Sequence, residues 1–180
     1  MGVKGDWVKV LSVAVLLLVN AATLAQSGIY RAPNIVPGLP EEIRNALEKQ
    51  GCQIPLGVID HANVIKGSFA KQGQIDWAVL CSVSGQSHIQ IFWGGPASCP
   101  NQIATHPDKN YLFRAPGGNE EYYRGLGVVG KEFILSHHGA YGGPTPPPIT
   151  HDGIDDRYLE KASVVHYCHK GKWQQLTGAD

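Results

Sequence analysis

The chain has 180 residues, of which 15 are lysine or arginine and 15 are aspartate or glutamate, so its formal net charge is zero with the histidines neutral. The basic residues are scattered and form no stripe, which argues against a protein that binds nucleic acid or an anionic membrane. This length suits one domain around one core.

Residues 1–25 have the composition of a secretory signal peptide. Lys4 and Lys9 precede an apolar run that ends at Val19, and small residues follow it. The run is too short to cross a bilayer as a helix, whereas a signal peptide needs only such a short apolar segment. We therefore expect an exported protein, periplasmic or extracellular, that is cleaved before Gln26 and has no membrane span afterwards.

All four cysteines follow this segment and enter a compartment that favours oxidation. Four cysteines allow three pairings, and buried free thiols are the alternative to two disulfides. A bridge between Cys52 and Cys81 is the preferred pair, because it would tie the end of the first helix to the first hairpin. The disulfide candidates are Cys52, Cys81, Cys99 and Cys168.

Residues 26–38 contain two prolines and no periodicity, so we expect an extended arm there. One amphipathic helix is predicted over Leu39–Gly51, with Pro40 in its first turn and the glycine as its stop. Apolar residues at helical spacing give this helix one narrow stripe that must lie on another element. We expect residues 39–180 to form a single α+β domain.

The remainder is rich in β-branched and aromatic residues in short apolar runs, which is typical of strands. Short connections such as residues 84–87 indicate antiparallel hairpins. The predicted fold class is α+β, an antiparallel β-meander sheet with the one N-terminal helix packed on it. The predicted strands are Val64–Phe69, Asp76–Val83, His88–Trp93, Tyr111–Arg114, Leu126–Val129, Glu132–Ser136, Ala162–Cys168 and Lys172–Leu176.

Two long segments rich in proline and glycine, Gly94–Asn110 and His137–Asp156, are expected to be loops. Loops of this length either carry a binding surface or serve as stiff connectors. Two carboxylate doublets, Glu120–Glu121 and Asp155–Asp156, are expected to be solvated loop edges, because adjacent residues on a strand face opposite ways and cannot share one acid–base site.

Residues 67–79 read Gly-Ser-Phe-Ala-Lys-Gln-Gly-Gln-Ile-Asp-Trp-Ala-Val. This segment resembles the repeated hairpin of FG-GAP and VCBS proteins, in which oxygen-bearing loop residues hold calcium. The resemblance implies a tight strand–turn–strand unit, but only Asp76 remains a carboxylate, which argues against calcium here. The chain is too short for a propeller. A looser similarity to small exported bacterial proteins of unassigned function implies one domain throughout.

The sequence contains no nucleophile elbow, phosphate loop or dinucleotide fingerprint, so we expect a non-enzymatic domain that binds a protein, a peptide or a cell-envelope component. Aromatic side chains are the candidate binding surface, and the alternative is that they form the core of the sheet. These candidates are Trp93, Tyr111, Phe113, Tyr122, Tyr123 and Tyr141; Trp77 and Trp173 are assigned to the core.

The alternative function is a metal-binding protein or a metal-dependent hydrolase that uses zinc or copper; otherwise no cofactor is predicted. His166 and Cys168 share one face of a predicted strand, and a loop histidine would supply a third ligand. A disulfide at Cys168 would remove the best ligand. The candidate ligands are His137, His138, His151, His166, Cys168 and His169.

Overall fold

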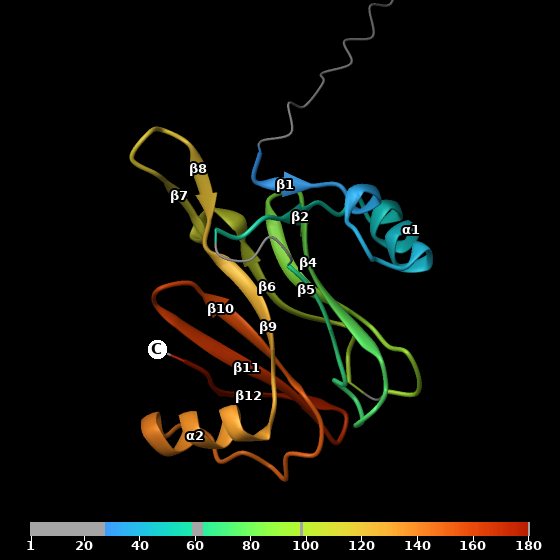
Figure 1. Cartoon of the computed structure of the whole chain (residues 1–180), viewed down its shortest axis with the longest axis vertical. Coiled ribbons are helices and arrows are strands. Elements are labelled where there is room, and N and C mark those ends of the chain that lie inside the picture. Colours follow the sequence, from blue (N-terminus) through green and yellow to red (C-terminus); the bar gives the residue numbers. More distant parts are fainter. Residues whose placement is uncertain (1–27, 59–62, 98, 180) are drawn as a thin grey trace, which may run out of the picture.

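The computed structural model describes residues 28–58, 63–97 and 99–179. Within these ranges the chain forms two four-stranded antiparallel sheets, two two-stranded antiparallel sheets and two α-helices (Figure 1). None of the described helices is both long enough and apolar enough to cross a membrane. The predicted signal peptide lies outside the described residues.

The first sheet has the strand order β3-β4-β5-β6. The turn between its two central strands consists of Ser84 and Gly85, with φ of 51° and 76°. Two consecutive positive φ angles are those of the turn whose twist matches a two-residue hairpin, so this turn sets the register of β4 and β5. The strands are β3 Val64–Gly67, β4 Asp76–Val83, β5 Gln86–Phe92 and β6 Gln102–Pro107.

The second sheet has the order β12-β11-β10-β9. Lys170 and Gly171, with φ of 48° and 78°, form the same kind of two-residue turn between its last two strands. Its strands are β9 Arg124–Val129, β10 Gly153–Tyr158, β11 Ala162–His169 and β12 Lys172–Thr177.

Two short two-stranded sheets complete the strands. One pairs β1 Tyr30–Arg31 with β2 Ile54–Pro55, and the other pairs β7 Leu112–Arg114 with β8 Glu120–Tyr122. Short 3₁₀ helices lie at Pro33–Ile35 and Asp108–Asn110. The described part of the expected arm is therefore a paired strand followed by a helical turn.

Helix α1, Glu41–Lys49, confirms the predicted N-terminal helix. Its apolar stripe lies on part of the outer face of the first sheet, where Ile43 and Leu47 pack against Val79 and Cys81 of β4. Cys81 also forms the predicted disulfide with Cys52, three residues beyond the helix. Covalent and apolar contacts thus fix α1 on β4.

Helix α2, Lys131–Tyr141, replaces the strand predicted at Glu132–Ser136, so that prediction was wrong. Ile134 is fully buried and packs on the outer face of the second sheet, against Val165 and Leu176. The pattern of a short apolar run does not distinguish a strand from a buried helix segment. Here the contact of the segment with the second sheet determines that it is a helix.

The two sheets share one apolar core. Side chains from the inner face of the first sheet meet others from β9 and β10 of the second. The molecule is therefore layered as α1, first sheet, second sheet and α2 (Figure 1). The buried core residues between the sheets are Phe69, Ala78, Leu80, Ile89, Ile91, Tyr122, Leu126 and Ile154.

The α+β class and the antiparallel connections are confirmed, but the single sheet with one helix is not, because the strands divide into two sheets and each carries a helix. Both predicted loops are also shorter than expected. Strand β6 lies inside Gly94–Asn110, and His137–Asp156 begins in α2 and ends in β10. A second disulfide, Cys99–Cys168, ties the segment before β6 to the second sheet.

The segment that resembles the FG-GAP hairpin forms a strand, turn and strand, β3 to β4. The Asp76 carboxylate is fully buried and accepts hydrogen bonds from the backbone N–H groups of Phe69, Ala70 and Gly94, at 2.9–3.0 Å, and from Nε2 of Gln74 at 2.7 Å. Four N–H donors thus supply the positive partners that buried carboxylate oxygens require.

Candidate functional site

The outer face of the first sheet is only partly covered. Side chains alternate between the faces of a strand, and Ile89 and Ile91 of β5 point into the core between the sheets. The intervening residues of β5 therefore form a row on the outer face. We call Gln86, His88, Gln90 and Phe92 the β5 row. Helix α1 packs mainly on the neighbouring strand β4, and two hollows adjoin the β5 row.

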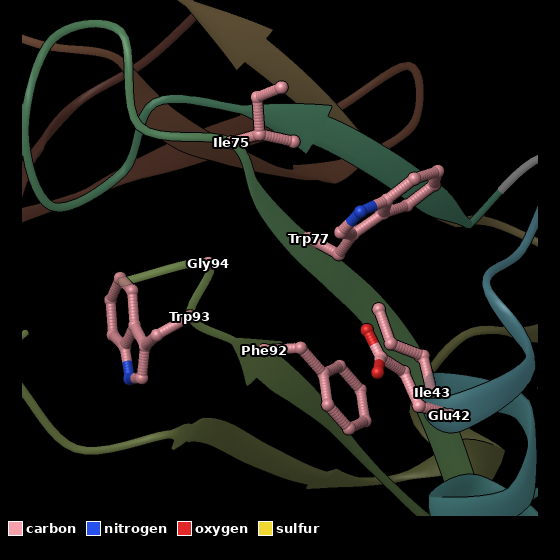
Figure 2. A pocket seen from close by; sticks show the side chains of 7 residues that line it. All are labelled: Glu42, Ile43, Ile75, Trp77, Phe92, Trp93 and Gly94. Atoms are coloured by element: carbon pink, nitrogen blue, oxygen red, sulfur yellow. The ribbon is translucent and has the colours of Figure 1, made fainter. Parts of the chain in front are cut away.

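The first hollow, the aromatic groove, has a volume of about 540 Å³. Trp77 and Phe92 are direct cross-strand partners and lie beside the first turns of α1 (Figure 2). Ile75 at its edge is 56% exposed, and Glu42 contributes its one carboxylate. Its lining residues are Glu42, Ile43, Ile75, Trp77, Phe92, Trp93 and Gly94.

The rim of the aromatic groove is held by a close backbone contact. A Cβ added at Gly94 would lie 1.9 Å from the carbonyl oxygen of Ile75. The Gly94 N–H donates to Asp76, which joins the segment after β5 to the first residue of β4. Only glycine allows this approach, so it fixes where the groove's aromatic side chains stand. Lys66 lies 5.8 Å from the centre of the Trp77 ring and adds a cation–π contact.

The second hollow, the carboxamide groove, has a volume of about 500 Å³. It lies at the other end of the β5 row, and β6 and the end of α1 supply its other walls. No lining side chain carries a formal charge with histidine neutral, and five are amides. The lining residues are Gln50, Val83, Gln86, His88, Gln90, Asn101, Gln102 and Thr105.

His88 is the titratable group of the carboxamide groove. Its side chain is 8% exposed, and burial lowers its pKa; the positive charge of Arg124 lowers the pKa further, while a hydrogen bond with Gln90 acts in the opposite direction. The imidazole is therefore neutral at pH 7. No described protein group hydrogen-bonds its Nε2.

Between the sheets lies a buried polar network that the sequence patterns did not reveal. Arg124 is fully buried and binds Asp156 through two hydrogen bonds of 2.8 Å. It also donates to the Ser87 hydroxyl at 3.1 Å and to the Ala104 carbonyl at 2.7 Å. Ala104 has a φ of 53° at an irregularity in β6, a conformation that non-glycine residues seldom adopt.

The Asp155–Asp156 doublet is buried, which corrects the expectation of a solvated edge. As strand geometry requires, its two carboxylates face opposite ways. Asp156 points between the sheets toward Arg124, and Asp155 is 2.7 Å from Nε of Arg157. Asp155 is bonded to Arg157 and Asp156 to Arg124, so the doublet does not form an acid–base pair.

Burial alone would raise the pKa of Asp156, but hydrogen bonding and charge from His166 and Arg124 outweigh it and lower the pKa to about 2. His166 is 4% exposed, and its Nε2 lies 3.5 Å from Asp156 Oδ2. These three residues belong to the second sheet, and the hydrogen bonds from Arg124 to Ser87 and Ala104 link the network to the first sheet.

The network continues toward strand β1. The Tyr122 hydroxyl donates to Ser87 at 2.8 Å and also lies 3.2 Å from the Asp108 carboxylate, which accepts from Ser82 and from Tyr30 as well. Ser87 is fully buried and already bonded, so it is not placed to act as a nucleophile.

The structure brings four of the predicted aromatic residues together and separates the other two. Ring contacts of 5.0–6.1 Å connect these four through Tyr158, although Tyr122 is fully buried. The connected residues are Tyr111, Phe113, Tyr122 and Tyr123. Trp93 stacks on Trp173 at 5.8 Å, and Tyr141 is exposed at the end of α2. Trp77, assigned to the core, packs on it but also lines the aromatic groove.

The predicted metal ligands are not gathered. Cys168 is bonded to Cys99 and is thereby removed as a ligand. His151 stacks on Tyr167 at 4.3 Å and lies within hydrogen-bond distance of two backbone carbonyls. Among the described residues, no three His, Cys, Asp or Glu side chains lie close enough to hold a metal ion.

The remaining predicted ligands lie apart from His166. His137 and His138 are on α2, where their Nδ1 atoms lie 2.8 and 3.2 Å from the carbonyl oxygens of Phe133 and Gly142. His169 ends β11.

The sequence predicted part of the β5 row. Polar and apolar residues of this strand alternate from His88 to Ile91, which is a strand pattern. Which face would stay open depended on the position of α1 and was not encoded locally. Comparisons with protein-family models, with curated protein sequences and with solved structures gave no match.

Proposed function

We propose that this protein is an exported, non-enzymatic binding domain whose ligand, a component of the cell envelope, lies against the outer face of the first sheet. The supporting observation is that two hollows, of about 540 and 500 Å³, adjoin the same row of side chains on β5. Concave sites lined by aromatic groups and a few polar groups are the usual form of ligand sites.

Export is supported by the two disulfides, which are typical of proteins from oxidising compartments. The leader-like composition of residues 1–25 agrees with it. The absence of enzymatic activity is supported by the buried network, whose carboxylates and hydroxyls are bonded to one another.

Binding to isolated cell envelopes tests this proposal. The exported form of the protein is incubated with envelope fragments of its host and sedimented, and the bound fraction is measured. Replacing Ile75 by lysine puts a charge at the rim of the aromatic groove, so we expect the bound fraction to fall at least fivefold. Leu135, which is 44% exposed on α2, provides the matched control.

The Leu135→Lys variant introduces the same side chain at another exposed apolar position, and we expect it to bind like the unmodified protein. An equal loss of envelope binding in both variants would show a general effect of charge. If both variants bind as well as the unmodified protein, the ligand lies elsewhere on the surface. If the unmodified protein does not sediment with the envelope fragments, the proposal is contradicted.

A further inference from the structure

The chemistry of the carboxamide groove restricts its ligand. A phosphate or carboxylate ligand would require lysine, arginine or converging backbone N–H groups, and a cationic ligand would require acidic side chains. No lining residue of either charged kind is present among the described residues of the groove. An apolar ligand would leave the five amides without partners, at a cost for each buried polar group.

Carboxamides match a ligand that both donates and accepts hydrogen bonds. Each glutamine or asparagine side chain has two N–H donors and one carbonyl acceptor, and a hydroxyl group offers the complementary pair. Gln86 and Gln102 are exposed and free to reorient, whereas Gln90 is fixed, because its Nε2 donates to the Asn101 carbonyl at 2.9 Å. The groove therefore combines a fixed amide with adaptable ones.

His88 adds an independent observation. Its ring is nine-tenths buried and lines the carboxamide groove, yet no described protein group hydrogen-bonds Nε2. A buried polar atom without a partner destabilises the structure that contains it. Nε2 itself has almost no exposed surface, so a hydroxyl group brought by a ligand would reach it and supply that partner after a local side-chain movement.

The aromatic groove supplies the second half of the recognition. Phe92 ends the β5 row that begins at Gln86, and Trp77 lies beside it (Figure 2). Six residues of extended strand span about 20 Å, which suits an elongated ligand. Aromatic rings accept the apolar C–H face of a sugar, and the amides accept its hydroxyl groups.

We propose that the carboxamide groove binds an uncharged oligosaccharide, one sugar ring of which packs on Trp77 and Phe92. This inference rests on the proposed function and names its ligand class. A peptide is less well suited, because extended peptides usually pair with the backbone at a sheet edge, whereas the β5 row lies on the face of a central strand.

Nuclear magnetic resonance of the exported, ¹⁵N-labelled protein tests the inference. Neutral tetrasaccharides of glucose, N-acetylglucosamine, mannose and galactose are titrated separately, and the side-chain amide signals of Gln86, Asn101 and Gln102 are followed. We expect saturable shifts of these signals with at least one tetrasaccharide. The double variant Gln86→Ala/Gln102→Ala should bind that tetrasaccharide about tenfold more weakly, since each lost neutral hydrogen bond contributes about a factor of three.

Gln175→Ala is the matched control, because Gln175 is an exposed glutamine on β12 of the other sheet. It should bind as the unmodified protein does. Absence of shifts with all four sugars, or equal weakening in the control, would overturn the inference. Shifts caused by a neutral penta-alanine peptide in place of the sugars would also overturn it, while loss of envelope binding in the Ile75→Lys variant would still support the proposed function.

Discussion

At the scale of single residues, buried carboxylates hold this molecule together because each has its own donors. Asp156 accepts two hydrogen bonds from Arg124, with Nε2 of His166 3.5 Å away, and Asp76 accepts from three backbone N–H groups and Gln74. A buried charge without such partners would cost several kcal/mol. Each carboxylate therefore makes its partners sensitive to substitution, and the ionisation of Asp156 also makes stability depend on pH.

The lowered pKa of Asp156, about 2 against an ordinary 3.8, predicts acid sensitivity. The folded state holds the carboxylate ionised more strongly than the unfolded state does. This stabilisation is present above about pH 4 and is lost as the pH falls toward 2, amounting to about 2 kcal/mol. Urea unfolding between pH 7 and pH 2 measures it.

In the variant Asp156→Asn, the free energy of unfolding should no longer contain the part that is lost in acid. At pH 7 it should also be about 3–5 kcal/mol lower, because Arg124 would remain buried without its counter-charge. Glu132→Gln, at an exposed position of α2, is the control and should keep the pH profile. An unchanged acid profile in Asp156→Asn would contradict the assignment.

The approach of Gly94 to the Ile75 carbonyl gives a second prediction. Gly94→Ala should lower the free energy of unfolding by about 2–3 kcal/mol, because the new methyl group meets backbone and the bond to Asp76 must lengthen. Gly117, around which nothing lies within 4 Å, provides the control, and Gly117→Ala should change stability by less than about 0.5 kcal/mol. Equal effects in thermal unfolding would refute the steric account.

At the scale of elements, the two disulfides join segments that also pack together. Cys52–Cys81 fixes the end of α1 on β4, over a separation of 29 residues, and Cys99–Cys168 spans 69 residues between the two sheets. Crosslinks stabilise chiefly by restricting the unfolded chain, and longer loops gain more. The Cys99–Cys168 bridge should thus contribute slightly more to the free energy of unfolding than the Cys52–Cys81 bridge.

We expect iodoacetamide to label none of the four cysteines of the native protein without reductant and all four after reduction and unfolding. Replacing Cys52 and Cys81 together by alanine should cost about 3.5 kcal/mol, and replacing Cys99 and Cys168 about 4.4 kcal/mol. Mass spectrometry of the labelled peptides and urea unfolding measure the two effects. Labelling of the unreduced protein would contradict the pairing.

At the scale of the whole molecule, the two sheets share one core, so neither buries its inner face alone. Leu80 of the first sheet and Ile154 of the second belong to the same buried cluster. Arg124 of the second sheet, which donates to Ser87 and Ala104 of the first, and Asn63, which bonds to both Pro55 and Leu126, connect the same layers. The fold should consequently behave as one cooperative unit.

Calorimetry should show a single unfolding transition with equal calorimetric and van't Hoff enthalpies. Leu80→Ala and Ile154→Ala should each shift that one transition to lower temperature, by a cost of about 2–5 kcal/mol. Two transitions, each moved by only one of the variants, would show that the sheets unfold independently.

Local patterns by themselves determined several features of this protein. Pro40, the acidic first turn and Gly51, with its φ of 69°, fixed helix α1, because these residues act through the backbone next to them. The Ser84–Gly85 turn fixed the β4–β5 hairpin for the same reason. The Cys52–Cys81 pair followed from the adjacency of those two elements.

The tertiary structure decided the rest. The run from Phe133 to Leu135 reads equally as strand or helix until Ile134 docks on the second sheet. Asp156 lies between the sheets with a counter-charge only because Arg124 of another strand binds it. The open face of the β5 row depends on where α1 packs. These features rest on contacts between residues far apart in the chain, which no local pattern contains.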